Sequence, residues 1–145
     1  MSKTQINKSY KDIPKKAYET LMNGNYLYGI SLLEDYIKTH QENPHVYNNL
    51  GAAYIKIGNY VEAEKYLNMA LELKNPPKKN LYYNFIELNI NMGNEFANKK
   101  NYSMAMSYFK IALSYIYKYK NENIDNNDNY ILNLKKQLEN QLYPK

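Results

Sequence analysis

Few residues of this chain have types and spacing that could support chemistry. His40 and His45 lie five positions apart on either side of Glu42, and three such side chains can together bind a transition metal. Their spacing matches no defined zinc site, and the chain has no cysteine that could supply a thiolate ligand or nucleophile. We therefore expect ordinary surface histidines, with no metal, no cofactor and no catalytic residue.

Two other patterns could bind a ligand, one a calcium ion and the other single-stranded nucleic acid. Asn123, Asp125, Asn127 and Asn129 alternate like the oxygen ligands of a calcium loop, but the sixth position is not glycine and the twelfth is Leu134. We predict a solvated loop there. Tyr115, Tyr117 and Tyr119 alternate with lysines, a pattern that can stack and clamp single-stranded nucleic acid. Helical spacing instead places Tyr115 and Tyr119 on one face, which favours packing against the last helix.

Composition narrows the class of function further. The chain has 145 residues, a net charge of +5, 18 tyrosines and no tryptophan. The excess of lysine is spread evenly along the sequence, so neither a nucleic-acid-binding arm nor a polybasic membrane patch is expected. No stretch approaches the ~20 apolar residues of a membrane span, and the first residues lack the apolar run of a signal peptide. These features predict a cytoplasmic protein.

The chain repeats itself internally. The triplet Gly24-Asn25-Tyr26 recurs as Gly58-Asn59-Tyr60, 34 residues later. In a third copy Asn101-Tyr102 follows at an offset of 42, which predicts about eight inserted residues near 77–86. After these turns, Ala63 and Leu67 correspond to Gly29 and Leu33 in the first copy, and Ala63, Leu67 and Ala70 correspond to Ala105, Phe109 and Ala112 in the third. A fixed period of this length is typical of stacked helical repeats.

The middle copy, residues 44–76, resembles a tetratricopeptide repeat. The positions that carry the resemblance are Tyr47, Leu50, Gly51, Tyr54, Gly58, Tyr60, Ala63, Leu67, Ala70 and Pro76. The resemblance implies an all-α fold: three helix-turn-helix repeats stacked as a short right-handed solenoid with a C-terminal capping helix. We expect one domain over 1–145, with repeats at about 10–43, 44–77 and 86–119.

Helix signals refine this architecture. We predict helices at 13–22, 26–40, 45–57, 60–73, 80–99, 102–120 and 129–142, with the fifth lengthened by the insertion. Gly24 and Gly58 suit the left-handed residue that ends a helix. Asn59 with Glu62 predicts a capping box. In the capping helix, Ile131, Leu134, Leu138 and Leu142 form an apolar stripe that would cover the third helix pair.

The resemblance also implies a concave groove formed by the first helix of each pair. The register places these side chains in it: Lys15, Tyr18, Met22, His45, Asn48, Asn49, Ala52, Lys56, Asn91, Asn94 and Asn98. Because an amide both donates and accepts, Asn49 and Asn91 could pair with the peptide units of an extended ligand. Of the carboxylate clamp by which some relatives bind chaperone tails, only Asn49 remains, and Glu87 would repel a carboxylate. A shift in the register of the long helix would put Lys79 in place of Glu87 and restore part of the clamp.

Taken together, the resemblance predicts a protein-interaction module, an adaptor or scaffold rather than an enzyme. It would bind an extended peptide or a partner helix, and no nucleic acid. The sequence leaves two alternatives open: a small chaperone for the secretion or assembly of a partner, and a structural subunit that self-associates.

Overall fold

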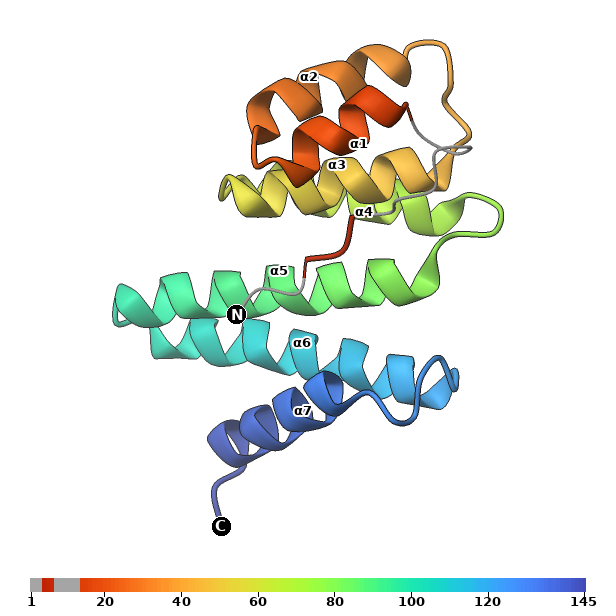
Figure 1. The fold of residues 1–145 in the computed structure, drawn as a ribbon. Helices are drawn as coiled ribbons and strands as arrows, with labels where there is room; N and C mark the ends of the chain where they lie inside the picture. The colour runs from red at the N-terminus through yellow and green to blue at the C-terminus, as the bar shows by residue number, and fades with distance from the viewer. Residues whose placement is uncertain (1–3, 7–13) are drawn as a thin grey trace. The chain divides into compact units, whose positions relative to one another are not determined.

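The computed structural model describes residues 4–6 and 14–145, and this part of the chain contains seven α-helices and no strand (Figure 1). The helices are α1 (Lys15–Met22), α2 (Tyr26–Tyr36), α3 (Pro44–Lys56), α4 (Tyr60–Glu72), α5 (Lys78–Asn98), α6 (Tyr102–Asn121) and α7 (Asn129–Leu142). The chain divides into two compact units, Met1–Asn84 and Phe85–Lys145, and α5 contributes residues to both. The predicted all-α class is confirmed.

Most predicted helix limits are within two residues of the observed ones, but α2 is shorter than expected. It ends at Tyr36 instead of residue 40. The Oγ1 of Thr39 donates to the Tyr36 carbonyl oxygen at 3.4 Å, and Nδ1 of His40 lies 3.3 Å from the same oxygen. The backbone N–H groups of Thr39 and His40 donate to this oxygen as well, at 3.3 and 3.1 Å, so α2 ends in a tight turn that converges on one carbonyl. At the other end of the first pair, residue 13 lies outside the described part, and Pro14 is the N-cap of α1 rather than a residue of its first turn.

Each second helix of a pair opens with the same capping arrangement. The side chains of Asn25, Asn59 and Asn101 accept hydrogen bonds from the backbone N–H three residues on. The residue before each asparagine has a positive φ: Gly24 at 84°, Gly58 at 78° and Lys100 at 61°. The predicted roles of both glycines are confirmed, and Asn59 caps α4 as expected. The reciprocal bond of the predicted capping box is replaced, because the Asn59 N–H donates to the Tyr54 carbonyl oxygen at 3.0 Å and the Glu62 carboxylate lies 2.8 Å from the Lys65 ammonium. Part of the asparagine content of this chain therefore serves helix initiation.

Lys100 is the one member of this set that carries a side chain in the left-handed region, where a Cβ crowds the following carbonyl. We predict that Lys100→Gly raises the free energy of unfolding by about 0.5–1 kcal/mol, because glycine removes this strain. Urea unfolding followed by circular dichroism measures the change. Gly58→Ala is the matched reverse variant and should be destabilising, and a Lys100→Gly protein no more stable than wild type would contradict the prediction.

Glycine also sets the distance between paired helices. A Cβ added to Gly51 on α3 would lie 2.4 Å from Cδ2 of Leu67 on α4, and one added to Gly93 on α5 would lie 2.5 Å from Cε1 of Phe109 on α6. In the first pair the roles are exchanged, because Gly29 on α2 faces Leu21 on α1 at 2.4 Å. In each of the three pairs, a large side chain of one helix therefore packs directly against the backbone at a glycine of the other. Gly51 occupies a position of the repeat where a small residue allows this close packing.

Tyrosines fill the space beside the α3–α4 pair in the first unit. The ring of Tyr66 stacks on Tyr54 at 5.7 Å and on Tyr47 at 6.1 Å between centroids. The Tyr54 hydroxyl donates to a carboxylate oxygen of Glu34 on α2, which links the two helix pairs. Burial and this carboxylate raise the pKa of Tyr54, so the phenol stays neutral and keeps donating.

In the second unit, α7 covers α6 as the predicted capping helix. Ile131, Leu138 and Leu142 are buried, and Asp128 caps α7 by accepting from the Ile131 N–H at 3.2 Å. The other carboxylate oxygen of Asp128 accepts from the Tyr119 hydroxyl at 3.1 Å. The side chain of Tyr119 is fully buried. One aspartate thus ties the start of α7 to the end of α6.

The buried Tyr119 makes the stability of the second unit sensitive to alkaline pH. Burial, with a contribution from the Asp125 carboxylate, raises the pKa of Tyr119 to about 12. Because this folded-state pKa lies above the unfolded value of about 10, the stabilisation is complete below pH ~10 and is lost as the pH rises through ~12. We predict that Tyr119→Phe reduces the dependence of urea stability on pH in this window. The exposed Tyr102→Phe is the control, and an unchanged Tyr119→Phe profile would contradict the assignment.

Candidate peptide-binding site

Three asparagine amides meet inside the first unit, where α3 faces the first part of α5. Asn48 and Asn49 come from α3 and Asn84 comes from α5, and all three side chains are fully buried. We call these three residues the asparagine cluster. Nδ2 of Asn84 donates to Oδ1 of Asn48 at 2.8 Å, and Nδ2 of Asn48 donates to Oδ1 of Asn49 at 3.3 Å. The amides therefore form a short chain of hydrogen bonds between the two helices.

The cluster binds the main chain of a residue distant in sequence. The backbone N–H of Gln5 donates to Oδ1 of Asn84 at 2.7 Å. The carbonyl oxygen of Gln5 accepts from Nδ2 of Asn84 at 3.0 Å and from Nδ2 of Asn48 at 3.1 Å. The stretch 4–6 that includes Gln5 is not helical and lies against α3 and the first part of α5 (Figure 1).

This geometry recognises a peptide backbone and not a side chain. One residue offers its N–H and C=O to the same amide, which is the pairing that a neighbouring β-strand would provide. No ionised group takes part in these bonds, so they confer no preference for a charged ligand. Any residue other than proline could stand where Gln5 stands, because proline lacks the N–H donor.

Burial makes the occupant important. An amide shielded from water costs free energy when its hydrogen bonds are unmade. Among the described residues, no buried side-chain nitrogen or oxygen lacks a hydrogen-bond partner. For Asn48 and Asn84, some of these partners are the backbone N–H and C=O of Gln5. A main-chain segment, or water, must fill this place whenever Gln5 is absent.

The structure places the predicted groove residues of the first unit in two environments. Lys15, Met22 and Lys56 are exposed, and Tyr18 and His45 are half-buried. Ala52 is fully buried, together with the cluster members Asn48 and Asn49. Lys15 lies 3.8 Å from the carboxylate of Glu19. Of the predicted residues, only Asn48 and Asn49 belong to the asparagine cluster.

The remaining predicted groove residues lie in the second unit. Asn91 is half-buried, and Asn94 and Asn98 are exposed. Glu87, which would repel a carboxylate ligand, is almost buried, and the Tyr130 hydroxyl donates to it at 3.5 Å. The role of Asn91 as a partner of Asn49 stays a prediction.

Sequence reasoning missed Asn84 and Gln5. The extra residues of the third copy lie within α5, which begins 34 positions after α3 but has 21 residues against 13. The first turns of α5 therefore follow the regular period, while the register taken from Asn101-Tyr102 applies only to its later turns. The signal for Asn84 in the sequence was an amide within the otherwise apolar stretch 81–86. Nothing in the sequence marks Gln5.

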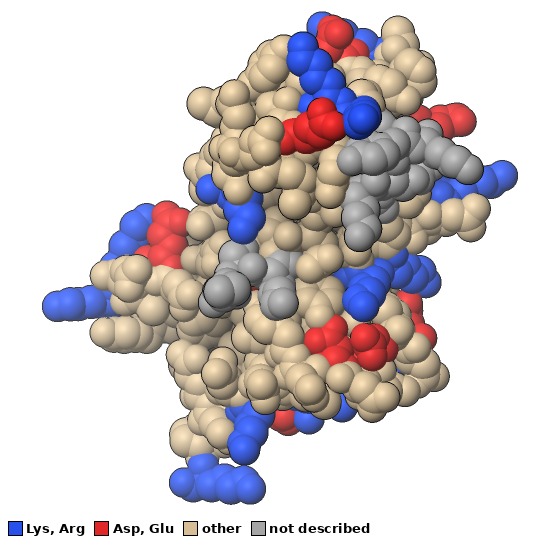
Figure 2. Space-filling model, in the orientation of Figure 1, with Lys and Arg blue, Asp and Glu red and all other residues tan. Residues whose placement is uncertain are grey.

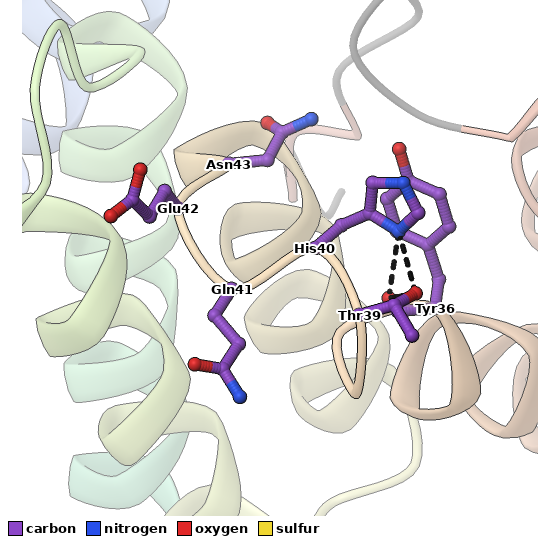
Figure 3. A pocket seen from close by; sticks show the side chains of 6 residues that line it. All are labelled: Tyr36, Thr39, His40, Gln41, Glu42 and Asn43. Atoms are coloured by element: carbon purple, nitrogen blue, oxygen red, sulfur yellow. Dashed lines mark hydrogen bonds between the residues drawn. The ribbon is translucent and has the colours of Figure 1, made fainter.

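His40 makes local contacts at the turn after α2. His40 stacks on Tyr36 with ring centroids 4.0 Å apart, and its Nδ1 lies 2.8 Å from Oγ1 of Thr39. Tyr36, Thr39 and His40 all line a pocket of about 440 Å³ at the turn after α2. In Figure 3 the side chains of Gln41 and Glu42 point away from His40. Within residues 4–6 and 14–145, no three His, Asp or Glu side chains are grouped to hold a metal ion.

The other two polar patterns are used within the fold. Asp125 accepts from the Asn127 N–H at 3.1 Å, and Asn123 accepts from the Asn126 amide at 3.2 Å, so these loop oxygens organise their own turn. Tyr115 stacks on Phe85 at 4.6 Å, and the ammonium of Lys118 lies 5.0 Å from its ring centroid. Lysines and acidic residues are interspersed on the face that Figure 2 shows.

Comparison with known proteins agrees with the repeat pattern. Residues 44–74, which contain α3 and α4, match the family model described as tetratricopeptide repeat. No curated protein and no solved structure matches the chain.

The helix pairs, the glycine contacts between them and this match indicate a helical-repeat protein in which residues 44–74 form a tetratricopeptide repeat. Repeats of this kind serve protein interaction, so the chain is a protein-interaction module in that general sense. None of the helices in the described part is both long enough and apolar enough to cross a membrane.

The hydrogen bonds of the cluster predict an asymmetric response to mutation. Asn84→Leu leaves a buried Asn48 oxygen without its donor, and it should lower the free energy of unfolding by about 1–3 kcal/mol. Replacing both residues, in Asn48→Leu/Asn84→Leu, removes donor and acceptor together and should cost less than the single change. Urea unfolding of both variants tests this, and a double variant less stable than Asn84→Leu would contradict it.

Proposed function

We propose that this protein is an adaptor whose asparagine cluster binds an extended segment of a partner protein through the partner's main chain. The observation that carries the proposal is the pairing of one residue, Gln5, by both its N–H and its C=O with the amides of Asn48 and Asn84. A site that already accommodates one peptide unit of this chain has the shape and donors to accommodate another.

The proposal extends to the finer architecture. We infer one domain with three repeats, a cytoplasmic location and a groove on the first helices of the pairs. Within that groove the α3 residues and Asn84 supply backbone recognition, and exposed neighbours such as Met22 and Lys56 supply the contacts that select a partner. The amides carry no charge, which supports an internal segment of a partner rather than a free C-terminal carboxylate.

The test uses a phage-displayed library of random peptides selected on the full-length protein. Selected peptides, measured by fluorescence polarisation, should bind wild type and lose at least tenfold in affinity for Asn48→Leu/Asn84→Leu, since about two net hydrogen bonds disappear. Lys110→Ala, an exposed change on α6 outside the proposed groove, is the control and should leave the affinity unchanged. Circular dichroism should report the same helix content in all three proteins.

A second arm examines backbone recognition directly. N-methylation of one peptide residue at a time should abolish binding at the position that pairs with Asn84, because the methyl group replaces the required N–H. Peptides that bind the double leucine variant as tightly as wild type would place the binding surface elsewhere and would refute the proposal.

A further inference from the structure

We propose that the N-terminal segment around Gln5 is an internal competitor for the peptide site: it occupies the asparagine cluster in the free chain and must leave before a partner segment binds. This inference rests on the proposed function, because it assigns the resting occupant of the same amides. It adds a regulatory step, since access to the site then depends on release of the chain's own segment.

The donor inventory makes the two occupants mutually exclusive. The Asn84 amide nitrogen has two hydrogens, and both are used, one by Oδ1 of Asn48 and one by the carbonyl of Gln5. The Asn48 amide nitrogen is likewise committed, to the carbonyl of Gln5 and to Oδ1 of Asn49. No amide hydrogen of these two residues is left for a second carbonyl while Gln5 is in place.

The contact is also of a kind that can be exchanged. The three hydrogen bonds from the Asn48 and Asn84 amides run to the main chain of Gln5, so a partner's backbone can reproduce each of them. A single net hydrogen bond changes an equilibrium by about fivefold, and the buried amides require an occupant. An incoming peptide unit satisfies them in the same way, so exchange leaves no buried amide unpaired.

Covalent attachment favours the internal occupant. Gln5 is nine positions before Pro14, the N-cap of α1, so its segment cannot move further than about 3.5 Å per residue from that point. Short tethers of this kind correspond to effective concentrations in the millimolar range. A partner must therefore overcome a competitor that never diffuses away, and its apparent affinity falls by the fraction of time the site is open.

The experiment varies the tethered segment within the full-length chain. Gln5→Pro removes the N–H that donates to Asn84, whereas Gln5→Ala keeps the same N–H and C=O and is the matched control. The probe is a fluorescein-labelled synthetic peptide with the sequence of residues 2–10. We expect Gln5→Pro to bind it about fivefold more tightly than wild type, and Gln5→Ala to bind it as wild type does.

A second readout follows the displaced residue itself. In wild type the Gln5 amide should be protected from hydrogen exchange, and saturation with a peptide selected from the phage library should remove this protection. Loss of protection with the selected peptide, together with tighter binding by Gln5→Pro, supports internal competition.

The remaining outcomes separate the two proposals. Selected peptides that bind wild type and Gln5→Pro equally, with Gln5 still protected, would overturn the competition while leaving a binding module. Failure of the residue 2–10 peptide to bind Gln5→Pro, when selected peptides do bind, would do the same. A wild-type dimer that becomes a monomer in Gln5→Pro, measured by light scattering, would show that the occupant comes from a second copy and would also overturn it. Absence of binding by any peptide to any variant would overturn the proposed function itself.

Discussion

The close approach of paired helices is the constraint on which the rest of this structure depends. A bare backbone at Gly51 lets the Leu67 side chain fill the space where a Cβ would stand, and Gly93 does the same for Phe109. Close packing of this kind fixes the distance and rotation of each pair, because interiors tolerate little change in volume. The tyrosine stack of Tyr47, Tyr54 and Tyr66 and the bond from Tyr54 to Glu34 then extend the order of one pair to the next.

In the proposed function, that rigid frame lets the buried amides serve as a binding element. Asn48 is held on α3 and Asn84 on α5, so their bond at 2.8 Å requires the two helices to keep their spacing. A fixed pair of amides presents donors and an acceptor at the separation of a peptide unit before any ligand arrives, which reduces the ordering that binding requires. In this chain the same abundant residue type performs two tasks, because Asn25, Asn59 and Asn101 cap helices while the cluster recognises a backbone.

The proposed internal competitor connects packing to regulation. A site that binds only main-chain groups accepts almost any side chain, so many extended segments of other proteins could bind to it. Occupation by the chain's own Gln5 sets a threshold that a weak or accidental ligand does not pass. Selectivity must then come from side chains around the cluster, since the amide bonds do not distinguish one sequence from another.

The sequence by itself determined most of the secondary structure, the repeat at residues 44–74 and the asparagine caps, because these depend on local spacing. The period between Tyr26 and Tyr60, the glycines before the capping asparagines and the stripe through Ile131 and Leu138 are visible along the chain. Only the tertiary structure decided which amides meet. The extra length lies within α5, so its first turns keep the regular period and bring Asn84 to Asn48. Gln5 contacts Asn48 and Asn84, which lie 43 and 79 positions further along the chain. No sequence pattern predicts this contact, because a hydrogen bond from a side chain to a distant backbone group requires no periodic spacing of residue types.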